Sequence, residues 1–288
     1  NGNDLPCSFA PPEGVVTASS PTSGHGVFAT SSRSKEESSI LNVIEPWLFF
    51  GVFAVALGYS MVGHGGASGY LALLAFTAIP SAVGATTALV LNVFVAGITL
   101  VVFGRAKHFD WNLAWPLLLG SVPFAFLGGR LKFENQVQDL VLAAVLLYAA
   151  GVLILSVPAK DGESQPPVRS ILVGSGAGIG FLSGIVGVGG GIFLSPLMIL
   201  NRWAQPHKVA ALSAGFIFAN SLAGLSARPF DLLRESLSLW PLITVGILGA
   251  VGGSFLGAHR VSSLALRRAL GIVLLLAVAK LIQKGLGL

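Results

Sequence analysis

The chain has 288 residues, of which 53% are hydrophobic and only 10% are charged. Soluble domains carry roughly 25% charged residues, so this composition excludes a water-soluble globular protein. The formal net charge is +5, but the basic residues are scattered singly or in pairs, which argues against a nucleic-acid-binding surface.

Residues 1–44 are rich in Ser, Pro, Gly and Thr, have little apolar periodicity, and predict a disordered tail. The only cysteine, Cys7, lies in this stretch and excludes an intrachain disulfide or a cysteine metal cluster. The Ser-rich sequence around Arg33 faintly resembles a transit peptide, whereas Glu36 and Glu37 argue against one.

From residue 45 onward, charged residues separate long apolar segments. No charged residue occurs between Glu45 and Arg105 or between Arg169 and Arg202, and a membrane-spanning helix needs roughly 20 apolar residues. The pattern predicts an all-α, polytopic helical membrane protein. The expected long spans are 47–62, 82–103, 115–131, 139–157, 170–186, 208–226, 240–258 and 264–283, with shorter apolar segments at 66–79 and 191–200.

Several short motifs occur twice in the same order. The sequence VGHGGASG at 62–69 matches VGVGGG at 186–191, and Trp115-Pro116 matches Trp240-Pro241, with offsets of 124 and 125 residues. The repetition predicts an internal duplication.

The duplication divides the membrane part into two halves, 45–160 and 161–288, each with four long spans and one short half-helix or re-entrant segment. If the short segment crosses the membrane, the halves are inverted; if it turns back, they are parallel. The distribution of Lys and Arg over the loops leaves this choice and the orientation open.

The two glycine loops are the first candidate site. Paired Gly-interrupted segments at matching positions are the best sequence indication of a transporter's substrate site. A broken helix exposes backbone N–H groups, and the N-terminus of the half-helix that follows attracts a small anion. The alternative is close helix packing through small residues. A nucleotide-binding P-loop is excluded, because neither loop ends in Gly-Lys-Ser/Thr.

Polar residues downstream of each loop are the second candidate: Thr86, Thr87 and Asn92 in the first half and Ser213, Asn220 and Ser221 in the second. These residues line the solute path or, alternatively, bond neighbouring helices and their own backbone. His64 is the only ionisable group in its apolar stretch and is a candidate for proton or substrate contact, although Val188 occupies the equivalent position. The candidate substrate-binding residues are Gly63, Gly65, Gly66, Thr86, Thr87, Gly187, Gly189, Gly190, Gly191, Pro196, Ser213 and Asn220.

Apart from Asp139, the first residue of the predicted span 139–157, no Asp or Glu lies inside a predicted span, so a carboxylate-based ion relay is not expected. The sequence also lacks paired carboxylates, an activated nucleophile, a metal-ligand cluster and a cofactor motif. We therefore expect no enzyme activity, no catalytic residue, no metal and no cofactor. The expected partners are the lipid bilayer and a small anionic solute.

The segment 180–225 resembles the signature region of the TauE/SafE sulfite exporter family. The shared pattern is a glycine-rich run, a Pro a few residues later, and a basic or His residue before an Ala-rich helix; here it is carried by Gly187, Gly189, Gly190, Gly191, Pro196, His207, Ala210, Ala211 and Ser213. The first half holds a weaker copy, and the resemblance covers about residues 45–286.

The resemblance implies a secondary transporter, in the direction of export, for sulfite, sulfonates or related sulfur-containing organic anions. An anion channel or a non-transporting membrane assembly protein is the alternative. The expected location is the plasma membrane, with an organelle membrane as the alternative.

Overall fold

The computed structural model describes residues 45–131, 135–155, 164–165 and 167–259, together with isolated positions near the C-terminus. The predicted tail at 1–44 and most of the predicted span at 264–283 lie outside the described residues. In the described part every regular element is a helix, which confirms the predicted fold class.

The helices follow the predicted spans closely. Their bounds are α2 Pro46–Ser60, α3 Ala67–Leu74, α4 Ser81–Arg105, α5 Trp111–Arg130, α6 Asn135–Leu155, α7 Arg169–Val186, α8 Gly191–Leu200, α9 Pro206–Ser226, α10 Phe230–Ser238 and α11 Trp240–His259. Proline starts α2 and α9, where its missing N–H costs nothing. Asp110 caps α5 by accepting a hydrogen bond from the Asn112 backbone N–H.

Five described helices are long and apolar enough to cross a membrane: α4, α5, α7, α9 and α11. Large apolar side chains remain exposed on their outer faces; Leu248 is 60% exposed and Phe255 is 63% exposed. A soluble protein would hide such a surface, whereas lipid accepts it. The chain is therefore an integral, multi-pass membrane protein.

Helices α5 and α7 pack backbone against backbone. A Cβ added at Gly176, Gly180 or Gly184 of α7 would collide with the carbonyl oxygen of Leu117, Ser121 or Ala125 of α5, respectively. From one contact to the next, the residue numbers increase in both helices, so α5 and α7 are parallel. Small residues at every fourth position allow this approach, as is common between helices in membranes.

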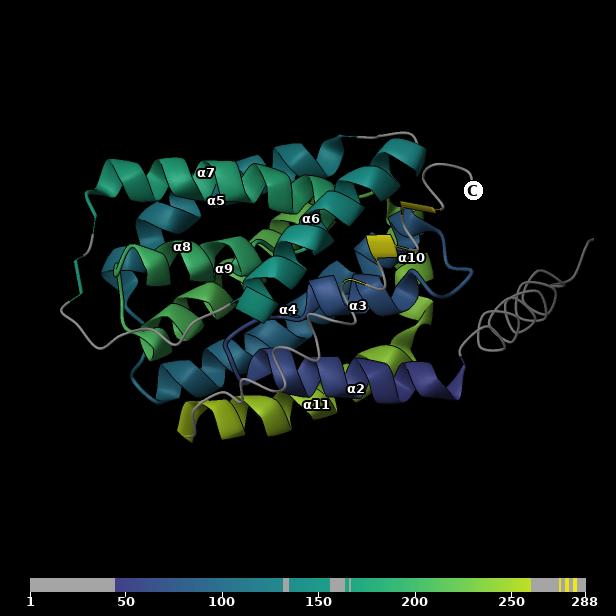
Figure 1. Cartoon of the computed structure of the whole chain (residues 1–288), viewed down its shortest axis with the longest axis horizontal. Helices are drawn as coiled ribbons and strands as arrows, with labels where there is room; N and C mark the ends of the chain where they lie inside the picture. Colours follow the sequence, from purple (N-terminus) through teal and green to yellow (C-terminus); the bar gives the residue numbers. More distant parts are fainter. Residues whose placement is uncertain are drawn as a thin grey trace, which may run out of the picture. The chain divides into compact units, whose positions relative to one another are not determined.

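Helices α2 and α11 form a second pair of the same kind. The glycines of α11 at positions 249, 253 and 257 lie against the backbone at positions 53 and 57 of α2 and at position 61 directly after it, again in parallel register. Figure 1 shows α2 and α11 side by side along one edge of the bundle and α5 and α7 near the opposite edge.

The two long central helices, α4 and α9, are antiparallel. Gly224 of α9 lies against Leu89 near the start of α4, whereas Gly215 lies against Leu100 near its end. Helix α11 follows the direction of α4, since Gly246 lies against Leu91 and Ala258 packs on the cluster that contains Phe103. Helix α5 follows that of α9, since Phe109, just before α5, lies against Gly215 and Gly129 lies against Gly224.

The helices that the predicted duplication equates are therefore antiparallel: α2 to α7, α4 to α9, and α5 to α11. Since α2 and α4 run in the same direction, the chain returns between them through residues 61–80, which include α3. If the predicted duplication holds, this geometry is the one expected for inverted halves, in which the short segment leads the chain back across the membrane.

Helix α10 was not predicted. Its sequence, FDLLRESLS, carries Asp231, Arg234 and Glu235 and lies between the predicted spans 208–226 and 240–258. One face packs on the start of α4, where the Ser236 hydroxyl donates to the Val83 carbonyl over 3.4 Å. A short amphipathic helix of this kind suits the membrane interface.

Candidate functional site

Two glycine loops connect the long helices to the short ones. The first loop, residues 61–66, joins α2 to α3, and the second, residues 187–190, joins α7 to α8. The residues that immediately precede α3 and α8, Gly66 and Gly190, have φ of 92° and 84° and provide no side-chain cap. The first-turn N–H groups of a helix have no partner within the helix, so these two half-helices begin with uncapped donors.

Both loops converge on the centre of the bundle, at Asn92 of α4 and Ile217 of α9. The Asn92 Nδ2 donates a hydrogen bond to the Val188 carbonyl over 3.3 Å, and a Cβ at Gly65 would collide with the Asn92 Oδ1. A Cβ added at Gly65 or at Gly189 would lie 2.9 Å from the same methyl group of Ile217. The starts of α3 and α8 are thus brought together.

The contacts of the two loops are reciprocal. Gly63 lies against the backbone of Ala210, and Gly187 lies against Ala85; these two pairs correspond to each other at the sequence offsets of the predicted duplication. Asn92 and Ile217 correspond in the same way. These are the contacts that equivalent positions of the predicted duplication would make.

Several polar side-chain atoms near the loops are buried and have no hydrogen-bond partner. An unsatisfied buried polar group costs about 1–3 kcal/mol, and each one in a native structure calls for an explanation. Those on residues that contact the loops or follow them directly are Asn92 Oδ1, Ser183 Oγ, Ser221 Oγ and the Tyr70 hydroxyl; Thr87 Oγ1 and both side-chain atoms of Asn220 lie on the central helices.

The chemistry of this junction suits an anion. Amides, hydroxyls and uncapped backbone N–H groups are hydrogen-bond donors, and helix N-termini carry partial positive charge. No Asp, Glu, Lys or Arg occurs in either loop, in α2, in α3 or in α8. A bound anion would therefore meet donors without a competing carboxylate.

His64 lies in the first loop and faces the second half. Its Nδ1 is 3.1 Å from the Val62 carbonyl, and its ring meets Tyr59 edge-on at a centroid distance of 6.3 Å. Its Cδ2 is 3.7 Å from a Cβ built at Gly191, the first residue of α8. The fold thus places the one titratable side chain of the loops beside the start of α8.

Other predicted residues are already engaged elsewhere. The Thr86 hydroxyl donates to the Ala82 carbonyl within α4 over 2.8 Å. Ser213 shares a 2.7 Å hydrogen bond with Ser195 of α8, and Pro196 lies partly buried inside α8. These contacts follow the alternative in which a polar group within a span bonds its own backbone or a neighbouring helix.

Sequence reasoning missed two residues at the junction, Tyr70 and Ser183. The sequence held an indication of Tyr70. This tyrosine is the fourth residue after the first loop, whereas the fourth residue after the second loop is the apolar Leu194. Asn92 and Ser221 were noticed only as part of a polar face, and nothing in the sequence indicated that Asn92 bridges both loops.

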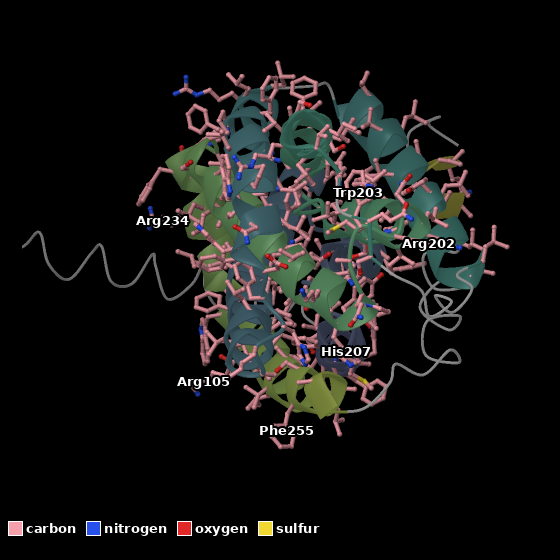
Figure 2. All side chains as sticks on the ribbon, turned by 90° about the vertical axis from the view of Figure 1, so that its left-hand side faces the viewer. Arg105, Arg202, Trp203, His207, Arg234 and Phe255 are labelled. Atoms are coloured by element: carbon pink, nitrogen blue, oxygen red, sulfur yellow. The ribbon has the colours of Figure 1, made fainter. Side chains whose placement is uncertain are left out.

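Basic side chains gather at one end of the bundle, where α4 ends and α5 and α9 begin. We call this the His207 end; it comprises Arg105, Lys107, His108, Asp110, His207 and Lys208. The rings of His108 and His207 lie 5.0 Å apart, and Lys208 Nζ is 3.2 Å from Asp110 Oδ2. Figure 2 looks onto this end of the molecule and labels Arg105, Arg202 and His207 spread around it.

The opposite end holds Arg228, whose Nη2 donates to the Gly184 carbonyl over 3.4 Å. Burial lowers the pKa of Arg228 from its ordinary value. Helices α5, α7 and α9 all finish near this residue, and helix C-termini stabilise a cation. These contacts explain the buried position of Arg228, which is not part of the site.

Comparison with known proteins decides the family. The family model described as "Sulfite exporter TauE/SafE" matches residues 48–281. The chain belongs to the TauE/SafE sulfite exporter family. It is also 31% identical over 242 residues to a "Probable membrane transporter protein y4hK" of Sinorhizobium fredii, covering 80% of this chain and 95% of that relative.

A second similarity is partial. Over 125 residues the chain is 26% identical to an "Undecaprenyl-diphosphatase 2" of Agrobacterium fabrum, covering 41% of this chain and 45% of that protein. No solved structure matches the chain. The family and the longer similarity support a membrane transporter.

Proposed function

We propose that this TauE/SafE family member is a secondary transporter that exports small anions, with sulfite, sulfonates and related sulfur-containing organic anions as the substrate class. The anion is held at the junction of the two glycine loops, between the starts of α3 and α8. The observation that carries the proposal is the convergence of two uncapped half-helices on Asn92, in a region with buried, unsatisfied polar groups.

The residues of the junction have different roles in binding the anion. The glycine loops and the first residue of α8 expose backbone donors at Gly63, Gly65, Gly66, Gly187, Gly189, Gly190 and Gly191. Asn92, Asn220, Ser221 and Thr87 add side-chain hydrogen bonds from α4 and α9. Thr86, Pro196 and Ser213 support the geometry of these helices rather than touch the anion. His64, beside the start of α8, contacts the anion or carries a coupling proton.

The inverted arrangement of the helices supports alternating access. In such transporters two similar halves rock around a site near the middle of the membrane. The His207 end offers a basic entrance that raises the local concentration of an anion. We place the protein in the plasma membrane, which fractionation of cells that express a tagged chain would test against an organelle membrane.

The test is flux in proteoliposomes at a set membrane potential, first with sulfite and then with a small sulfonate. A saturable flux that follows the potential supports the transporter. A flux that rises linearly with anion concentration would favour a channel. No flux above empty liposomes, with correctly folded protein, would favour a non-transporting assembly protein.

A further inference from the structure

The side chains of the two predicted halves differ at several equivalent positions of the junction. At four pairs of positions equated by the duplication, the first half has the more polar or bulkier polar side chain. These pairs are Tyr59 and Ser183, His64 and Val188, Tyr70 and Leu194, and Asn92 and Ile217. At these four positions, therefore, the side chains around the start of α3 are not repeated around the start of α8.

Among the first-half residues of these four pairs, Tyr70 is the one whose polar atom has no evident structural role. The residue is 0% exposed, and its hydroxyl has no hydrogen-bond partner. Side chains in helices lean back toward the N-terminus, and here the Tyr70 hydroxyl lies 2.9 Å from a Cβ built at Gly66, which precedes α3. The phenol thus points at the uncapped start of its own helix.

The alternative is that this hydroxyl has only a structural role. Packing alone does not require it, because Leu194 fills the equivalent position of α8 and is itself 0% exposed. A buried hydroxyl without a partner destabilises the protein relative to a hydrocarbon of the same shape. Its neighbour Tyr59, by contrast, is satisfied by a 2.9 Å hydrogen bond to Ser68.

We infer that Tyr70 is a substrate-binding residue whose hydroxyl donates a hydrogen bond to an oxygen of the anion held at the start of α3. The inference rests on the proposed function and deepens it. A phenol adds one directional donor to the backbone N–H groups, which suits an anion with oxygen acceptors, such as a sulfite, sulfonate or carboxylate group.

The test uses Tyr70→Phe, which removes one oxygen and keeps the ring, with Tyr59→Phe as the matched control. Binding of sodium sulfite and sodium chloride to the purified full-length protein in detergent is measured by calorimetry, together with the melting temperature without ligand. A hydrogen bond to a charged group corresponds to roughly a 10–100-fold change in affinity.

We expect Tyr70→Phe to bind sulfite roughly 10–100-fold more weakly, to lose no more affinity for chloride than for sulfite, and to melt at or above the wild-type temperature. Tyr59→Phe should melt lower, because it leaves Ser68 without its partner, and should lose less sulfite affinity. Unchanged sulfite affinity in Tyr70→Phe, or a clear drop in its melting temperature, would overturn the inference. If the wild-type protein binds no anion, the proposed function fails instead.

Discussion

The side-chain amide of Asn92 donates a hydrogen bond to the backbone carbonyl of Val188 over 3.3 Å. Asn92 lies near the midpoint of α4, and Val188 belongs to the glycine loop of the other predicted half. The same side chain lies against Gly65 of the first loop. One residue therefore links both broken helices at the place where we propose that the anion binds.

Asn92→Asp keeps the size of this side chain but replaces a donor with a negative charge. A carboxylate buried beside the two half-helix starts would occupy their positive ends and repel the substrate. We expect flux of sulfite to fall by at least about tenfold, in line with the loss of a charge-assisted hydrogen bond. Proteoliposome flux checks this, with the protein first shown to be folded.

The matched control is Asn201→Asp, the same chemical change at an exposed position that follows α8. It should leave flux close to the wild-type value. Equal flux in the Asn92→Asp and wild-type proteins would remove Asn92 from the site.

Gly180→Leu tests the packing of α5 against α7. Any side chain at Gly180 meets the Ser121 backbone, and overpacking of this kind costs about 1–3 kcal/mol or more. We expect a lower melting temperature and aggregation in size-exclusion chromatography. Gly178→Leu on the same helix should be tolerated, because a Cβ there meets nothing within 4 Å; similar stability of the two variants would refute the close approach.

The His207 end gives a pH prediction. Burial, and then the charge of His207, lower the pKa of His108 from its ordinary value of 6.5. The unfolded chain therefore takes up a proton at a higher pH than the folded protein does. Stability should be fully present above about pH 6.5 and should fall as the pH drops from there toward the lower folded-state pKa.

Arg105, Lys107, His207 and Lys208 add positive charge around His108, and Asp110 is the acidic group of this end among the residues that the structure describes. Melting temperatures measured between pH 5 and 8 should show this loss of stability on acidification, and the loss should be smaller in His108→Gln. A wild-type melting temperature that rises on acidification would contradict the assignment.

His64 is tested through the pH dependence of flux. If it carries a coupling proton, His64→Gln should flatten the dependence of sulfite flux on pH while the protein stays folded. A pH profile that matches the wild type would leave His64 with a contact role only. The conservative Gln keeps a polar group next to Tyr59 and the start of α8, so the change isolates the titration.

The sequence predicted most of the fold because apolar spans bounded by charges have little freedom in a bilayer. The predicted segment 191–200 coincides with α8, and 208–226 differs from α9 by two residues at its start. Helix α10 was missed because nine residues with three charges resemble a loop. What the sequence could not show is that one face of this short segment packs on α4, where Ser236 donates to the Val83 carbonyl.

The site was predicted only in outline. Repeated glycines indicated where the helices break, but spacing along the chain could not show that Gly65 and Gly189 both meet Asn92 and Ile217. Nor could it separate Thr86, whose hydroxyl bonds its own helix, from Thr87, whose hydroxyl has no partner. These distinctions depend on which face of α4 turns toward the loops.

The most direct test of the account is sulfite flux through Gly189→Leu/Gly190→Leu in proteoliposomes at a set membrane potential. Both glycines have positive φ, at 77° and 84°, so leucines there strain the loop and fill the junction. Gly178→Leu is the control for insertion and folding. We predict that the double variant inserts but loses flux, while the control transports normally. Normal flux through a folded double variant would contradict an anion site between the two half-helices.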